Sequence, residues 1–157
     1  MSSQVLSKQS VEVTAFATLL RAQATVTRAL NAHLLADHGL TINDYEVLLR
    51  LARSPAGRMR RVDLAAEVLL TPSGVTRLLD GLERSGYVER GACATDRRVV
   101  YAVLTEAGRA KQNAAAASHL AQVEEYFSGR LDQLELESLA ALLTRLGGPV
   151  DAGACVA

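Results

Sequence analysis

Apolar and polar positions follow two different periods along this chain. Apolar residues recur three and four positions apart, which predicts six helices, at residues 10–37, 44–53, 62–68, 72–85, 106–127 and 132–146. β-branched and aromatic residues dominate 87–90 and 99–104, and these two runs predict a hairpin around the loop 91–98. A further short strand is expected near Met59. The predicted fold class is mainly α with a small β-hairpin (α+β).

The predicted helix at residues 72–85 has clear boundaries and two distinct faces. Thr71 is suited to cap its N-terminus, Pro72 suits the first helical position, and Gly86 suits a left-handed exit. At the helical period one face is apolar, with Val75, Leu78, Leu79 and Leu82. The other face is polar, with Ser73, Arg77, Asp80 and Arg84, and Thr76 lies at its edge. Such a face is either solvated or in contact with a partner.

Two neighbouring helices also carry specific expectations. Asn43 with Glu46 three residues later predicts a capping box for the helix at 44–53, with Ile42 packing onto Val47. In the helix at 62–68 we expect Val62, Ala65 and Val68 to face inward.

The first helix ends at Gly39, and its length of well over twenty residues is more than one small core can cover. Dimerisation is the natural way to bury the remainder.

Charge is unevenly distributed, although acidic and basic residues balance at 17 each over 157 residues. Between Arg50 and Arg98 ten arginines face six carboxylates, a local net charge of +4, so the flanks together carry −4. This asymmetry predicts a polyanion-facing centre in a single-domain protein. Without an apolar run of membrane-spanning length or a signal peptide, we expect a soluble, cytoplasmic protein with no membrane partner.

Candidate chemistry outside the charged centre is sparse. Cys93 and Cys155 are too few for a disulfide framework, so we expect free thiols. His33, His38 and His119 lack metal-ligand spacing, and neither a Gly-rich phosphate loop nor a Ser/His/Asp arrangement is present. We therefore predict no metal, no cofactor and no enzymatic activity.

A helix, a tight turn, a second helix and a two-stranded hairpin make up a winged helix-turn-helix. A helix fits the major groove of DNA, and an arginine-bearing hairpin can follow phosphates or enter the minor groove. Asp96-Arg97-Arg98, five residues, and then Leu104-Thr105-Glu106-Ala107-Gly108 match the D-x-R-x5-L-T-x-x-G wing signature of the MarR family of bacterial transcription regulators. Residues 72–88 also resemble that family's recognition helix and its exit. The resemblance extends over residues 10–146.

The resemblance implies a homodimer that binds double-stranded DNA. Residues 10–38 and 106–146 would form mainly dimerisation helices, 44–104 the winged helix-turn-helix lobe, and 147–157 a flexible tail. Two recognition helices would then meet a palindromic operator. Such a regulator is most often a repressor, released by a small-molecule effector that changes the spacing of its two lobes.

The same resemblance assigns roles to individual residues. Ser73, Thr76 and Arg77 would meet bases and phosphates, and Arg98 would lie nearest the minor groove. Asp96 would brace the wing by pairing with a wing arginine. Phosphate contacts are expected from Arg60, Arg61, Arg84 and Arg97. The alternative for these four is solvated surface or an intramolecular ion pair, as for Arg84 with Asp80 at i, i+4.

An effector site and two alternative functions remain open. Many family members bind small aromatic or amphipathic molecules between the dimerisation helices and the DNA-binding lobe, where His33, His38, Tyr45, Arg28 and Arg50 are candidates, with packing or surface as the alternative. Cys93 lies beside Arg90, Arg97 and Arg98, whose charge can lower a thiol pKa. An oxidant-responsive regulator is one alternative, although the family's sensing thiols lie in the N-terminal helical region and no cysteine precedes position 93 here. A winged-helix protein-interaction module is the other, and the polar face of residues 72–85 argues against it.

Overall fold

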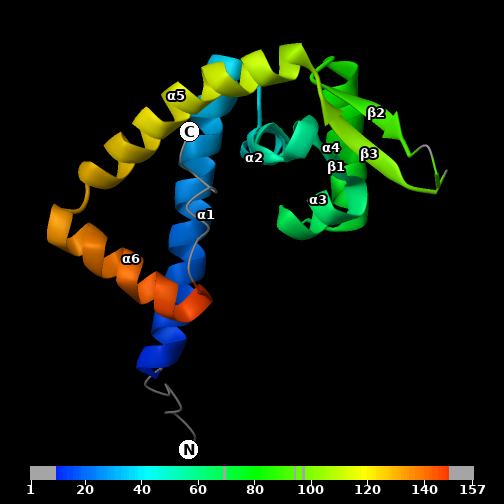
Figure 1. The fold of residues 1–157 in the computed structure, drawn as a ribbon. Coiled ribbons are helices and arrows are strands. Elements are labelled where there is room, and N and C mark those ends of the chain that lie inside the picture. The colour runs from blue at the N-terminus through cyan, green and yellow to red at the C-terminus, as the bar shows by residue number, and fades with distance from the viewer. Residues whose placement is uncertain (1–9, 69, 94, 97, 149–157) are drawn as a thin grey trace, which may run out of the picture.

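The computed structural model describes residues 10–148 except 69, 94 and 97 (Figure 1). Its elements in order are α1 (Val11–His38), α2 (Ile42–Arg53), the 3-10 turn η1 (Pro55–Gly57), β1 (Arg58–Arg60), α3 (Arg61–Glu67), α4 (Pro72–Arg84), β2 (Val88–Ala92), β3 (Val100–Leu104), α5 (Glu106–Ser128) and α6 (Gln133–Gly147). The predicted mainly α class is confirmed. The expectations for Arg97, for Cys155 and for the tail at 149–157 lie outside the described residues.

The three strands form one antiparallel sheet in the order β1-β3-β2. Met59 is paired with Ala102, so the short strand expected there is confirmed. In the hairpin, Gly91 is paired with Tyr101 and Ala92 with Val100, which fixes the register of the wing. The hairpin projects from the side of the lobe away from α1 (Figure 1).

One hydrophobic core holds the helix-turn-helix and the sheet together. Its largest fully buried side chains are Leu34, Val47, Leu48, Leu51, Leu64 and Leu79. The predicted apolar stripe of α4 is confirmed, because Val75, Leu79 and Leu82 are buried and Leu78 packs against the same cluster. Each such side chain contributes about 1.5–3 kcal/mol when it leaves water. This burial fixes which face of α4 points outward.

Helix caps explain where the elements begin and end. The side chains of Ser10, Thr71, Thr105 and Asp132 each accept a hydrogen bond from a backbone N–H in the first turn of α1, α4, α5 and α6, respectively. Gly86 leaves α4 with a φ of 74°, as predicted, since this left-handed conformation favours glycine.

Two of the local predictions are wrong. The capping box of α2 starts at Thr41, whose backbone N–H donates to Asp44 Oδ2 at 2.8 Å, while Asp44 N donates back to Thr41 Oγ1 at 3.1 Å. Thr41 and Asp44 have the required spacing of three, so Asn43 and Glu46 do not form the box, and Glu46 pairs with Arg50 instead. Val62 is 69% exposed and Leu64 is buried in its place, whereas Ala65 is buried and Val68 packs against the core, as predicted.

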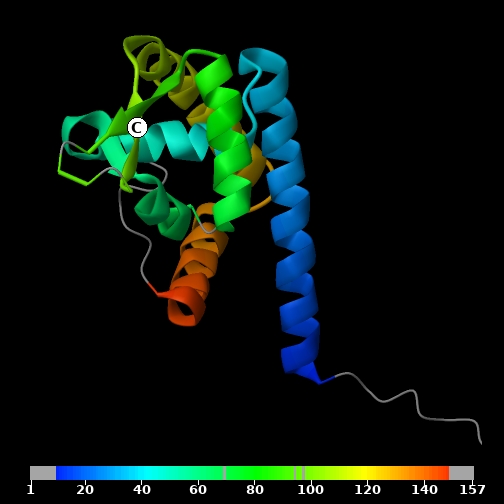
Figure 2. The ribbon, with the colours of Figure 1, turned by 90° about the vertical axis from the view of Figure 1, so that its right-hand side faces the viewer.

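The long helices α1, α5 and α6 lie together beside the lobe, and the first half of α1 extends well beyond it (Figure 2). Two of them, α1 and α6, carry exposed large apolar residues, namely Val11, Val13, Phe16, Leu19, Leu20, Leu134, Leu142, Leu143 and Leu146. Within the described ranges no helix combines the length and apolarity that crossing a bilayer requires. The chain therefore presents a long apolar surface that its own fold does not cover.

Candidate nucleic-acid interface

The outward face of α4 begins at a well-anchored N-terminus. Thr71 Oγ1 accepts from Gly74 N at 3.1 Å and lies 3.2 Å from Ser73 Oγ. Beyond this cap the side chains of Ser73, Thr76, Arg77 and Arg84 are all exposed. Within the part of the chain that the structure describes, Arg77 and Arg84 make no hydrogen bond or ion pair with their side chains. Two guanidinium groups of α4 are thus available to an external anion.

The wing presents a third such group. Asp96 Oδ1 accepts a hydrogen bond from the backbone N–H of Arg98 at 2.9 Å, and Val99 N donates to the Asp96 carbonyl at 3.1 Å. This turn leaves the Arg98 side chain exposed and, among the described residues, without a side-chain partner. Asp96 therefore braces the wing through the backbone of Arg98. The ion pair that we predicted for it has no counterpart among the described arginines.

Arg60 and Arg61 are both engaged in intramolecular ion pairs. Arg60 contacts Asp63 with two nitrogens, Nε to Oδ2 at 2.6 Å and Nη2 to Oδ1 at 2.8 Å. Arg61 Nη2 lies 2.6 Å from Glu83 Oε1, and its side chain is only 19% exposed. For these two residues the structure shows the alternative to a phosphate contact. Arg84 does not pair with Asp80, which binds Arg90 instead.

A network centred on Glu83 was not predicted from the sequence. Arg90 donates from Nε to Glu83 Oε2 at 2.8 Å and from Nη2 to Asp80 Oδ1 at 2.9 Å, while Glu83 also binds Arg61. These contacts link α3, α4 and β2. The available signal was two carboxylates three residues apart on a helix, followed by an arginine in the next strand.

The five predicted effector residues lie in separate surroundings, and His38 Nε2 lies 2.6 Å from Ser118 Oγ. Tyr45 is buried in the core with its ring centroid 4.9 Å from that of His119, and Arg50 pairs with Glu46 and Glu67. His33 lines a surface cavity with Tyr126 and Arg130. The side chain of Arg28 is exposed on α1. Tyr45 and Arg50 therefore have structural roles, which was the alternative reading.

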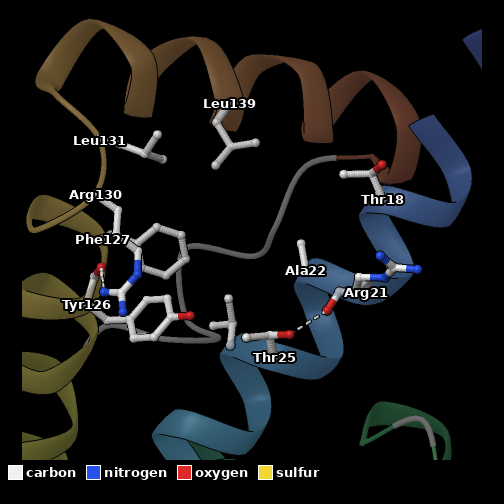
Figure 3. A pocket seen from close by; sticks show the side chains of 10 residues that line it. Thr18, Arg21, Ala22, Thr25, Tyr126, Phe127, Arg130, Leu131 and Leu139 are labelled. Atoms are coloured by element: carbon white, nitrogen blue, oxygen red, sulfur yellow. Dashed lines mark hydrogen bonds between the residues drawn. The ribbon is translucent and has the colours of Figure 1, made fainter. Parts of the chain in front are cut away.

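Two other cavities lie between helices. One, of about 420 Å³, lies between α1, α5 and α6, where Phe127, Leu131 and Leu139 face Ala22 and Arg130 lies over the Tyr126 ring at 3.7 Å (Figure 3). The other, of about 340 Å³, lies between α2 and α5 and is lined by Leu49, Ala52, Arg53, Arg109, Gln112, Asn113, Ala116 and Ala117. Gln112 is the buried polar side chain of this second cavity.

Cys93 is a half-buried free thiol at the base of the wing loop. Its pKa is lowered from the ordinary value because Thr95, whose Oγ1 lies 3.3 Å from Sγ, hydrogen-bonds to it. Hydrogen bonding thus has the effect that the sequence predicts from Arg90, Arg97 and Arg98, of which Arg97 lies outside the described residues. In the described ranges, no three His, Cys, Asp or Glu side chains gather as they would around a metal ion.

A helix-turn-helix followed by a β-hairpin, with exposed unpaired arginines on the second helix and on the hairpin, defines a winged helix-turn-helix protein of the DNA-binding class. A family model described as "MarR family" matches residues 38–99. The HTH-type transcriptional regulator MhqR of Bacillus subtilis is 31% identical over 132 residues, which cover 84% of this chain and 88% of MhqR. The chain belongs to the MarR family of winged helix-turn-helix transcription regulators.

Solved structures of this family share the fold. Sco3205 of Streptomyces coelicolor, a MarR family transcriptional regulator solved in complex with DNA, is 25% identical with a TM-score of 0.79, covering 99% of this chain and 98% of Sco3205. CouR of Rhodococcus jostii, solved bound to p-coumaroyl-CoA, is 28% identical with a TM-score of 0.70, covering 96% and 99%. Transcription regulation and DNA binding are thus the activities of this fold.

Proposed function

We propose that this chain is a homodimeric, sequence-specific repressor that places two copies of α4 in the major groove of a palindromic operator. The observation that carries this proposal is the selective exposure of cations. Among the described residues, Arg77, Arg84 and Arg98 have exposed side chains without an ion pair on α4 and the wing, whereas Arg50, Arg60, Arg61 and Arg90 are neutralised by carboxylates of the same lobe. Ser73, about one turn before Arg77, and the adjacent Thr76 supply the donors and acceptors for base edges.

The homodimer is supported by the uncovered apolar faces of α1 and α6. Phe16 and Leu20 on α1 are 62% and 53% exposed, and Leu142 on α6 is 55% exposed. Contiguous exposed surface of this kind marks an interface. A second copy of the chain covers it by two-fold symmetry, and the same symmetry requires two inverted half-sites about 10 bp apart. Because the partner in this proposal is chromosomal DNA, the protein acts in the cytoplasm.

Release by an effector rests on the cavities. The space between α2 and α5 joins the lobe to the long helices, and Arg53, Arg109 and Gln112 line it beside apolar Leu49. A small aromatic or amphipathic molecule with an anionic group suits these walls, and the complex of the related CouR with p-coumaroyl-CoA shows that a MarR-like fold accepts an aromatic acyl ligand. Binding there changes the angle between α2 and α5 and hence the spacing of the two α4 helices.

The direct test is a gel shift with the DNA just upstream of the chain's own gene. We expect a shift that survives competition by random duplex and weakens steeply between about 50 and 200 mM salt, because several arginines displace counterions. Salt-independent binding, or no preference over random duplex, contradicts the proposal. Recovery of a stoichiometric protein partner in a pull-down, with no DNA shift, favours an interaction module instead.

The effector is tested separately by a thermal-shift screen with phenolic acids, metals and peroxide. A ligand that raises the melting temperature and also abolishes the gel shift identifies the effector class. If only peroxide abolishes the shift, and Cys93→Ser removes that response, the oxidant-responsive alternative is correct.

A further inference from the structure

We propose that Glu83, assisted by Asp80, is a specificity-determining residue: it withholds Arg61 and Arg90 from the DNA backbone and fixes the wing relative to α4. This inference rests on the DNA-binding function proposed above. It concerns two arginines that contribute to the local excess of positive charge but are not free to bind phosphate.

Both carboxylate oxygens of Glu83 are occupied by guanidinium groups from different elements. Oε1 lies 2.6 Å from Arg61 Nη2 of α3, and Oε2 lies 2.8 Å from Arg90 Nε of β2. The Glu83 side chain is 20% exposed, so water screens these contacts less than it screens an ordinary surface pair. A single residue of α4 thus joins the helix that precedes it and the strand that follows it.

Arg90 stands at the edge of the DNA-facing surface. Its side chain is 58% exposed and bridges Glu83 and Asp80, and Asp80 shares a helix face with Arg77 and Ser73, three and seven residues earlier. Donation to Glu83 raises the pKa of Arg90 above its ordinary value, as expected for a cation held by carboxylates. Without these carboxylates, Arg90 is one more mobile cation beside Arg77 and Arg84.

A freed arginine changes binding in a predictable way. Each additional phosphate contact steepens the dependence of log K on log salt by about 0.9 and strengthens binding to any duplex, whatever its sequence. The freed arginine does not strengthen the base contacts, since these depend on the placement of α4 and the wing. Loss of Glu83 therefore raises non-specific affinity and lowers the preference for the operator.

The experiment compares Glu83→Gln with Glu89→Gln. The Glu89 side chain of β2 is exposed and forms no ion pair or hydrogen bond with other described residues, so its variant makes the same change in net charge without releasing an arginine. Affinities for an operator duplex and a random duplex are measured by fluorescence anisotropy at several salt concentrations. We expect E83Q to bind random duplex about 5–10-fold more tightly than E89Q, with a salt slope steeper by about one, and to lose about tenfold in its preference for the operator.

Equal salt slopes and equal operator preference for E83Q and E89Q overturn the inference. Circular dichroism shows whether E83Q folds. If it does not, Asp80→Asn takes its place, because this variant removes one of the two carboxylates that hold Arg90. The D80N variant must then exceed E89Q in affinity for random duplex and in salt slope. The wild type separates the two proposals. No preference of the wild type for any operator refutes the proposed function, whereas the comparison of variants on random duplex addresses Glu83 alone.

Discussion

At the scale of single residues, the ion-pair partners of each arginine decide which guanidinium groups remain available to a phosphate. Ten arginines lie between positions 50 and 98, and their sequence positions do not distinguish a paired side chain from a free one. The structure draws Arg60 and Arg61 into ion pairs and leaves Arg77, Arg84 and Arg98 exposed. The last three are therefore the side chains through which we expect phosphate and groove contacts.

Arg98→Ala tests the wing. We expect a loss of operator affinity of roughly tenfold, about 1.4 kcal/mol, because a groove or phosphate contact disappears while no hydrogen bond or ion pair of its side chain with the described residues does. Fluorescence anisotropy gives the affinity, and thermal melting checks that the fold is intact. Arg28→Ala removes the same charge from an exposed site on α1 and serves as control. Unchanged affinity in R98A contradicts the assignment of the wing.

His119 predicts how stability depends on pH. Burial lowers its pKa below the ordinary 6.5, against a smaller opposing effect of Glu46, and its buried Nδ1 has no hydrogen-bond partner. The unfolded chain therefore takes up a proton more readily, so stability falls as pH drops through about 6.5. Melting temperatures at about pH 7.5 and pH 5.5 measure this fall, which we expect to be smaller in His119→Gln. An identical fall in both proteins contradicts it.

At the scale of elements, the last glycine of the wing signature joins α5 to the exit of α4. A Cβ at Gly108 would clash with the carbonyl oxygen of Tyr87 and come within 2.8 Å of Leu104 Cδ1. Thr105 fixes the same junction, since its backbone N–H donates to the Tyr87 carbonyl at 3.1 Å. This close approach positions the long helix α5 against the DNA-binding lobe.

Gly108→Ala is expected to lower the free energy of unfolding by about 1–3 kcal/mol, because backbone must move to admit the methyl group. Gly81→Ala is the matched control, since a Cβ there meets nothing within 4 Å, and removing a helical glycine raises stability by about 0.5–1 kcal/mol. Urea denaturation measures both changes. A G108A variant as stable as the wild type shows that the junction tolerates a side chain.

Elements and caps that depend on local signals were predictable from the sequence. The apolar stripe of α4, the cap at Thr71 and the exit at Gly86 follow from residues within one helix. The network of Glu83 was not predictable, since Arg61 lies 22 positions earlier and no local sequence signal indicates that the two residues pair. The burial of Tyr45 was not predictable for the same reason, since Tyr45 packs against His119 of α5, more than seventy residues away in sequence.

At the scale of the whole molecule, α1 and α6 expose apolar side chains that we expect a second subunit to cover. Leu20→Asp places a carboxylate on this apolar face, and a buried unpaired charge costs several kcal/mol. We expect weakening of self-association by roughly 100-fold and loss of operator binding. Analytical ultracentrifugation measures the first. Val62→Asp makes a similar change on α3, where Val62 is 69% exposed, and this variant should remain dimeric. A dimeric L20D variant locates the interface elsewhere.

Selection of bound duplexes from a random pool tests the central claim most directly, because it requires no knowledge of the operator. The wild-type chain should enrich one inverted repeat with half-site centres about 10 bp apart, bound at least about 1,000-fold more tightly than random duplex. Arg77→Ala should weaken or abolish the enrichment, since it removes a free guanidinium from the outward face of α4. A pool that stays random after repeated rounds with the wild type contradicts sequence-specific DNA binding through α4 and the wing.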